Sequence, residues 1–417
     1  MPKAWVYAIG LNIFSQLSDA SKHAHTALNN RDCSGESAET DGRKRRKIIQ
    51  DEIENEDENT NEMDTGEVLI RPRCIAQGEF EAEVLWVGWS ETLLRIDGRV
   101  ELRGFSAYET ETTKLLQLSN GANVVTGFGW ADLIGIVDSY GQIWQFKPGA
   151  TTTYIATTTY ILYVDKELSS AFDNTVQRVT ITGTEHVAVL HDYGTAITTF
   201  SSLPDFYAYS ETKKKEWRVG SRKQFGYHQH LQFTCMRAGE AHFVALDSGG
   251  HVYTWGASLH GELLQPRGSV VRPRVVPALE GISMRDVATN GFVTACLSQD
   301  TKDVYIWGWT PDTRIIGLPN AGDDVAGIID QFDEDEDFVI ESVAVGNGFI
   351  VLASSNSITR ELCVWFAGGT DLTNMFGLPR SETLVKVNGE WSGKRSDEYG
   401  LMVSCGAACI FVSVYQK

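Results

Sequence analysis

The chain has 417 residues, with 36 Lys and Arg against 55 Asp and Glu, and a formal net charge of −19. This balance argues against a protein that coats DNA, because such binding depends on clustered Lys and Arg that release counterions. No apolar run is long enough to cross a bilayer or resembles a signal peptide, and the seven cysteines include no Cys-x-x-Cys pair. We therefore expect a soluble intracellular protein of the cytoplasm or nucleus, without a disulfide framework or a zinc ribbon.

The N-terminal residues predict a strand, and the segment after it has a different composition. Residues 5–17 are largely apolar and end in the Gly-x-Asn-x-x-x-Gln-Leu sequence of Gly10 to Leu17. From Asn29 to Glu67 there are six Lys or Arg and 13 Asp or Glu, with almost no aromatic residue. Such a segment cannot bury enough apolar surface to offset the entropy lost on ordering. We therefore predict a disordered charged insertion over residues 29–67.

A short basic run lies inside this insertion, directly before the acidic residues 51–58. It consists of Arg43, Lys44, Arg45, Arg46 and Lys47. A basic run of this length on a flexible loop has the form of a nuclear import signal. The alternative is a solvated charge block that balances its acidic neighbour. The sequence leaves both interpretations open.

A unit of three strands then recurs along the chain. Each copy has a strand that ends in small residues, an apolar strand, a turn and a third strand, and residues 236–256 are the clearest copy. Four of the turns carry a glycine, at Gly98, Gly141, Gly194 and Gly250, and degraded turns follow near 302 and 360. The turns are roughly 45 to 60 residues apart, a period that in an all-strand pattern indicates a propeller of four-stranded blades.

The two ends of the chain carry complementary halves of the repeat. Residues 5–17 hold only the part after the turn, and residues 401–414 hold only the part before it. Together with six complete units they make seven. We predict an all-β, seven-bladed propeller as a single domain over residues 1–417. The N-terminal strands would complete the last blade and close the ring, which removes open sheet edges.

Three sequence elements resemble the regulator of chromosome condensation repeat family. They are Gly-x-x-His-x-x-x-Leu at 239–246, Gly-x-Val-Tyr-x-Trp-Gly at 250–256 and the element at 10–17. The likeness covers nearly the whole chain outside residues 18–80. Within the family, residues 277–309 are most similar to the branch of the condensation-regulator domain-containing protein one. The last unit, from residue 388, also resembles the fungal alpha-tubulin suppressor propellers, relatives of which act with the Elongator and diphthamide pathways.

Catalytic or metal-binding constellations are not evident in the sequence. His186 and His242 occupy one repeat position, which holds Phe292 in another copy, so no shared acid–base role fits it. His228 and His230 are two residues apart in a polar loop, but a third metal ligand is missing from their surroundings. Phosphate-loop and nucleophile-elbow motifs are also missing. We therefore expect no enzyme activity, metal or cofactor.

A second acidic segment falls between two repeat units and ends in five consecutive carboxylates. These are Asp333, Glu334, Asp335, Glu336 and Asp337. Such a loop at the rim of the ring either is simply solvated or attracts a basic partner over a long range. We take it as the candidate partner-binding site.

The function that follows from these observations is a non-enzymatic scaffold or regulatory subunit that binds protein partners through rim loops. The resemblance implies a link to tRNA or diphthamide modification, or to chromatin. Two alternatives remain open: guanine nucleotide exchange on a Ran-like small GTPase, as in the founding family member, and a chromatin adaptor for a histone-modifying enzyme. We do not expect direct binding to a membrane or to DNA.

Overall fold

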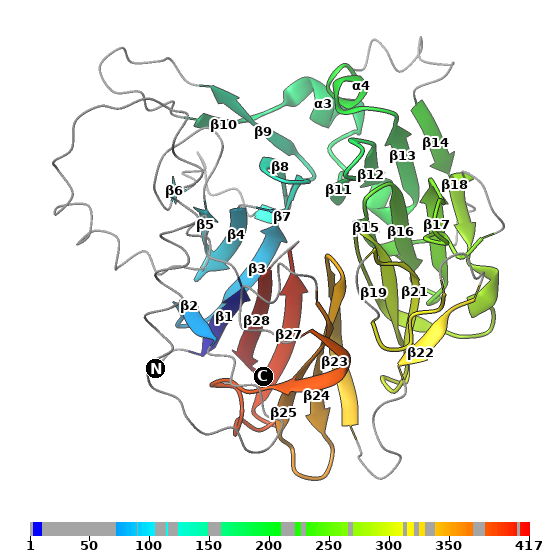
Figure 1. The fold of residues 1–417 in the computed structure, drawn as a ribbon. Coiled ribbons are helices and arrows are strands. Elements are labelled where there is room, and N and C mark those ends of the chain that lie inside the picture. Colours follow the sequence, from blue (N-terminus) through cyan, green and yellow to red (C-terminus); the bar gives the residue numbers. More distant parts are fainter. Residues whose placement is uncertain are drawn as a thin grey trace, which may run out of the picture. The chain divides into compact units, whose positions relative to one another are not determined.

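The computed structural model describes residues 3–10, 72–89, 91–104, 114–115, 124–148, 160–209, 222–226, 231–265, 270–311, 315–320, 325–329, 338–369, 380–406 and 409–417. These residues form seven four-stranded antiparallel sheets (Figure 1). The sheets are the blades of a seven-bladed β-propeller, as the repeat period predicted. Within the described residues, no helix is long and apolar enough to span a membrane.

Six blades are built from strands that follow one another in the sequence. Blade 1 holds β3 (Ala82–Val87), β4 (Glu91–Ile96), β5 (Arg99–Gly104) and β6 (Lys114–Leu115). Blade 2 holds β7 (Val124–Gly129), β8 (Leu133–Asp138), β9 (Ile143–Pro148) and β10 (Tyr160–Val164). Blade 3 holds β11 (Arg178–Ile181), β12 (Val187–His191), β13 (Ala196–Phe200) and β14 (Arg222–Gly226).

The next three blades repeat this order. Blade 4 holds β15 (Phe233–Ala238), β16 (His242–Asp247), β17 (Val252–Gly256) and β18 (Val270–Val275). Blade 5 holds β19 (Met284–Asn290), β20 (Phe292–Ser298), β21 (Val304–Trp309) and β22 (Gly327–Ile329). Blade 6 holds β23 (Phe338–Gly346), β24 (Phe349–Asn356), β25 (Leu362–Gly368) and β26 (Ser381–Val387).

Blade 7 is assembled from both ends of the chain, which confirms the predicted ring closure. Its order is β2 (Arg73–Gly78), β1 (Ala4–Gly10), β28 (Cys409–Gln416) and β27 (Tyr399–Cys405). The β1 strand pairs along its full length with β28, from Ala4 opposite Tyr415 to Gly10 opposite Cys409. Its other edge pairs with β2. Strand β2 lies in the stretch that we had placed outside the repeats, so the sequence did not reveal this fourth strand.

Two short helices interrupt the strands around blade 3. Helix α3 (Lys166–Ala171) begins at Asp165, whose carboxylate accepts a hydrogen bond from the amide of Leu168 at 2.9 Å. Helix α4 (Leu203–Tyr207) is capped in the same way by Ser202. Turns of 3₁₀ helix lie at Asp192–Gly194 and Pro277–Leu279. Such caps satisfy amide groups that the first helical turn leaves without partners.

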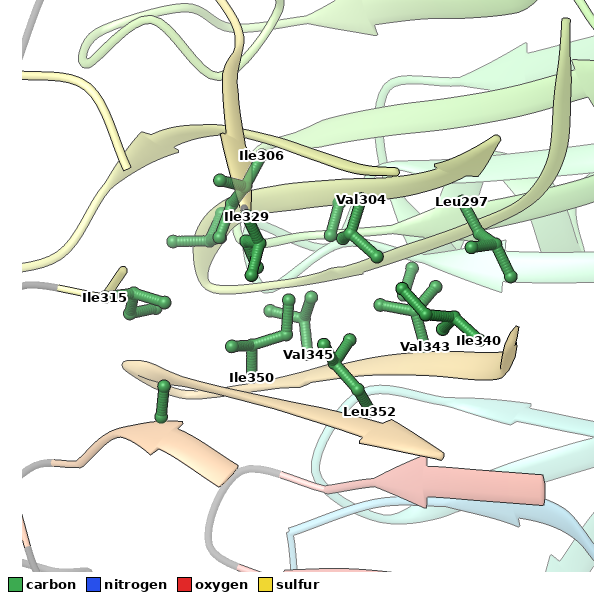
Figure 2. Packing of buried hydrophobic residues seen from close by; sticks show 14 of the residues in the cluster. Leu297, Val304, Ile306, Ile315, Ile329, Ile340, Val343, Val345, Ile350 and Leu352 are labelled. Atoms are coloured by element: carbon green, nitrogen blue, oxygen red, sulfur yellow. The ribbon is translucent and has the colours of Figure 1, made fainter. Parts of the chain in front are cut away.

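Separate apolar layers fill the space between neighbouring blades. Figure 2 shows the layer between blades 5 and 6, where Leu297, Val304 and Ile306 of blade 5 face residues of blade 6. The residues of blade 6 in this layer include Ile340, Val343, Val345, Ile350 and Leu352. Most are β-branched side chains, which pack well on a pleated surface. The alternation of apolar residues in each unit follows from this layered core.

In the Trp-Gly pair at 307–308, the tryptophan is a core residue and the glycine lies within strand β21. Trp307 is 1% exposed and its indole nitrogen donates a hydrogen bond to the carbonyl of Glu262 in the neighbouring blade at 2.9 Å. The adjacent Gly308 has a φ of +105°, and a Cβ atom there would lie 2.0 Å from the carbonyl oxygen of Phe292. Only glycine fits such a position without a shift of the backbone.

Candidate functional site: the central channel

A cavity of about 960 Å³ is lined by the innermost strand of every blade. The strands that contribute to it are β3, β7, β11, β15, β19, β23 and β27. Because every blade contributes its innermost strand, the cavity is the central channel of the propeller. The cavity is lined mainly by strands of the blades, which hold the surrounding side chains in place.

At one end of the channel, turns after the innermost strands form hydrogen bonds to the next blade, between blades 1 and 2 and along blades 3 to 5. The amide of Trp89 in blade 1 donates to the carbonyl of Ala131 in blade 2 at 2.8 Å. The amide of Thr184 in blade 3 donates to the carbonyl of Glu240 in blade 4 at 3.0 Å, and the amide of Glu240 donates to the carbonyl of Gly291 in blade 5 at 2.6 Å. We call this arrangement the ring of turns.

Aromatic side chains gather at this end of the channel. Trp89 and Trp130 follow β3 and β7, and Phe292 and Trp309 lie opposite each other on β20 and β21. All four line the cavity, and Trp89 is 48% exposed. The ring of His260 stacks on Trp309 with centroids 4.3 Å apart, which fixes the orientation of the indole. We call Trp89, Trp130, Phe292 and Trp309 the aromatic mouth.

Positive charge is concentrated along one part of the channel wall. Arg178 of β11, Arg237 of β15 and Arg285 of β19 all line the cavity, together with Asp286. Burial, together with the positive charge of Arg237, lowers the pKa of Arg178 to about 10. Burial also raises the pKa of Asp286, although Arg237 acts in the opposite direction. The guanidinium groups are charged at neutral pH, so this wall is positive in a protein that is acidic overall.

Known proteins with similar sequences match only part of the chain. No family model matches it. Human RCC1 domain-containing protein 1 is 34% identical over 107 residues, which are 24% of this chain and 28% of that protein. The human E3 ubiquitin-protein ligase HERC2 is 38% identical over 82 residues, which are 19% of this chain and 2% of the ligase. The matched region thus spans less than a third of each of these two relatives.

Solved structures match the whole chain in fold. Yeast RCC1 (Prp20) bound to Kap60 superimposes with a TM-score of 0.60 at 14% identity, over 100% of this chain and 90% of that one. Human WBSCR16 gives a TM-score of 0.59 at 14% identity, over 100% and 99% of the two chains. The chain shares its propeller fold with these two proteins. The resemblance found in the sequence is thereby confirmed at the level of the fold.

The repeated Gly-x-x-His position has a packing role in this propeller. The imidazole of His242 is fully buried, and its Nε2 atom lies 3.0 Å from the hydroxyl oxygens of both Thr289 and Thr294 in the next blade. Burial lowers the pKa of His242 to about 4, so the ring is neutral at physiological pH. A Cβ atom at Gly239 would lie 2.3 Å from this ring, which explains the glycine of the motif.

The other histidines of the sequence analysis behave differently. His186 is exposed and lies 3.0 Å from the hydroxyl of Thr184. His228 and His230 lie outside the described residues. Within the described part of the propeller, no group of three or more His, Cys, Asp or Glu side chains is arranged to hold a metal ion.

Both charged segments that we selected from the sequence lie outside the described residues. These segments are Arg43–Lys47 and Asp333–Asp337. In the sequence, the latter falls between β22 of blade 5 and β23 of blade 6. The roles of both segments remain predictions.

The sequence did not reveal the channel arginines as candidate site residues. Arg178 and Arg237 stand in strands that are otherwise small or apolar, namely Arg-Val-Thr-Ile and Phe-Thr-Cys-Met-Arg-Ala. A charged residue in the innermost strand of a blade is the signal that could have identified them. The proximity of these two arginines depends on how neighbouring blades pack. The sequence of a single repeat carries no information about that packing.

Proposed function

We propose that this propeller is a non-enzymatic scaffold that binds a partner protein at the aromatic mouth of its channel. The observation that carries the proposal is the aromatic mouth itself, where residues from three blades line one cavity. Tryptophan is enriched among the residues that dominate binding energy in protein interfaces. An exposed indole such as that of Trp89 offers a large apolar contact area to a partner.

Replacing Trp89 or Trp309 with alanine is expected to weaken partner binding by at least about tenfold, because each indole is a candidate energetic anchor. Affinity purification with mass spectrometry identifies the partner, and titration calorimetry with the purified partner gives the affinity. Tyr140→Ala is the matched control: this tyrosine is 69% exposed but lies in the turn after β8, at the other end of its blade. Equal affinities of the Trp variants and the wild-type protein would refute the proposed site.

The identity of the partner separates two classes of scaffold. The family resemblance supports a role with tRNA or diphthamide modification, or with chromatin as an adaptor for a histone-modifying enzyme. One structure of Prp20 is described with its binding properties to Gsp1p and histones. The ligase activity of HERC2 gives no support for an enzyme here, because the match covers only 2% of that protein.

Nucleotide exchange on a Ran-like small GTPase is the alternative function. Its support is the fold shared with Prp20 across 100% of this chain. The test is release of a fluorescent guanine nucleotide from a purified Ran-like GTPase in the presence of the propeller. Accelerated release would establish exchange activity. An unchanged release rate would rule out exchange on this GTPase and leave the scaffold function as the proposal.

The loop Asp333–Asp337 is a second proposed contact, because five carboxylates would attract a basic partner. Replacement of all five by Asn and Gln should slow association several-fold and flatten its dependence on salt, since the Debye length at physiological ionic strength is about 8 Å. Stopped-flow association at several salt concentrations measures both quantities. An unchanged association rate and an unchanged salt dependence would show that the loop is only solvated and does not contribute to binding.

Nuclear import through Arg43–Lys47 also stays a proposal. Its support is the basic run itself, in a segment of otherwise acidic composition. Import would place the protein in the nucleus as well as the cytoplasm. A nuclear location would favour the chromatin adaptor over a role in tRNA or diphthamide modification.

A further inference from the structure

Two arginines of neighbouring blades share a partly buried place in the channel wall. Arg178 and Arg237 belong to adjacent innermost strands, β11 and β15, and both side chains are only partly exposed. Arg237 is close enough to act on Arg178, and its positive charge adds to burial in lowering the pKa of Arg178. Two guanidinium groups of like charge in a confined space are unfavourable unless an anion lies near them.

The described part of the channel provides little negative charge to offset this pair. Asp286 is the carboxylate whose charge acts on both arginines. Among the described residues, neither arginine forms an ion pair, and Arg237 donates a hydrogen bond only to the carbonyl of Met236, at 3.3 Å. Arg285 adds a third positive charge, and its guanidinium donates to the backbone carbonyl of Glu341 at 2.5 Å.

The remaining carboxylates of the channel have other neighbours. Glu83 forms an ion pair with Arg95. Glu341 accepts a hydrogen bond from the hydroxyl of Ser355 at 2.9 Å. The carboxylate of Glu240 lies against Gly183 in the ring of turns. Asp286 is thus the carboxylate whose charge interacts with Arg178, Arg237 and Arg285, so this part of the wall has a local excess of positive charge.

We infer that the channel binds a carboxylate of an acidic peptide segment from the partner protein, held between Arg178 and Arg237. The inference rests on the proposed function, because the same cavity carries the aromatic mouth through which the segment would enter. The planar fork of a guanidinium matches a carboxylate with two hydrogen bonds. Apolar residues beside the acidic one would contact the aromatic mouth, which favours a peptide over a small free anion.

A fluorescein-labelled peptide of alternating Glu and Leu is the probe for this site, with fluorescence anisotropy of the full-length protein as the readout. We expect saturable binding that weakens roughly tenfold or more in Arg178→Gln and in Arg237→Gln, since hydrogen bonds to charged groups have about this effect. Arg380→Gln is the matched control, because Arg380 is exposed and does not line the channel. No saturable binding, or equal weakening in the control, would overturn the inference.

Two further measurements keep the test decisive. Arg178→Lys and Arg237→Lys retain the charge and lose the fork, so they should also weaken binding, and they replace the Gln variants if those do not fold. Inorganic phosphate is the competitor: displacement of the peptide at equal concentrations would show a site for small anions and contradict the peptide assignment. Thermal melting of each variant excludes unfolding as the cause of lost binding.

The experiments distinguish a failure of the proposed function from a failure of this inference. If Trp89→Ala lowers affinity for the purified partner while both Arg→Gln variants keep it, the scaffold proposal stands and the carboxylate site is refuted. If Trp89→Ala leaves partner binding unchanged, the aromatic mouth is refuted, and the Glu-Leu peptide still decides whether Arg178 and Arg237 bind a carboxylate.

Discussion

Deletion of residues 1–12 is expected to prevent stable folding, or to lower the melting temperature by at least roughly 10 °C. The deletion removes β1, which lies between β28 and β2 in blade 7. It exposes an edge of β28 and leaves β2 without its partner. Val6 and Ile9 are at most 3% exposed, and each buried aliphatic side chain contributes about 1.5–3 kcal/mol.

Aromatic contacts increase the expected cost of this deletion. The hydroxyl of Tyr7 donates to a carboxylate oxygen of Glu390 at 2.9 Å, and its ring meets Trp391 edge-on with centroids 5.6 Å apart. The ammonium of Lys394 lies 4.5 Å from the ring centroid of Trp5. All of these contacts join the N-terminal strand to residues near the C-terminus, so the deletion separates the two ends of the chain.

Addition of a peptide in trans supplies the control for this prediction. A synthetic peptide of residues 1–12 should raise the melting temperature of the truncated protein, because it can restore β1. A peptide with Val6→Asp and Ala8→Asp places charges at buried positions and should not. Differential scanning fluorimetry measures both effects. Melting of the truncated protein at the wild-type temperature would show that the ring does not depend on β1.

The sequence predicted the first three strands of most blades more fully than the fourth. The second and third strands are apolar and flank a turn, so they repeat visibly. The fourth strands lie at the outer edge of each blade, where burial does not impose a pattern. Strand β18 contains Pro273, which an edge strand tolerates because one side needs no amide donor, and β14 reads Arg-Lys-Gln-Phe-Gly. Such strands can be recognised only when the strands with which they pair are known.

The sequence predicts the channel site even less well than it predicts these edge strands. A single repeat shows which residues lie on an innermost strand, but the distance between Arg178 and Arg237 follows from the packing of blade 3 against blade 4. The aromatic mouth likewise combines Trp89 with Trp309, which are far apart in the sequence and join one cavity only when the ring closes. Sites of this kind depend on the assembled propeller.

Acidification is expected to destabilise the propeller through His242. The ordinary pKa of histidine is about 6.5 and burial lowers that of His242 to about 4, so between these values the unfolded chain binds a proton that the folded chain does not. The free energy of unfolding therefore falls as the pH falls from about 6.5 to about 4. The difference of 2.5 pKa units corresponds to roughly 3 kcal/mol at the acidic end of this range.

Replacement of His242 with phenylalanine isolates this contribution from that of the carboxylates. Blades 5 and 6 carry Phe292 and Phe349 at the same position, so the ring is compatible with the packing. Thr289 retains the carbonyl of Val293 as a hydrogen-bond acceptor after the change. Urea unfolding at several pH values should show a smaller loss of stability below pH 6.5 in His242→Phe than in the wild-type protein.

The exposed histidine of blade 3 provides the matched control for this pH dependence. His186 occupies the corresponding repeat position but lies at the surface, so His186→Phe should keep the wild-type slope of stability against pH. If His242→Phe and the wild-type protein lose the same free energy between pH 6.5 and pH 4, the buried imidazole does not set the acid sensitivity. A reduced slope in His242→Phe alone would tie the acid sensitivity to the contact between blades 4 and 5, where His242 meets Thr289 and Thr294.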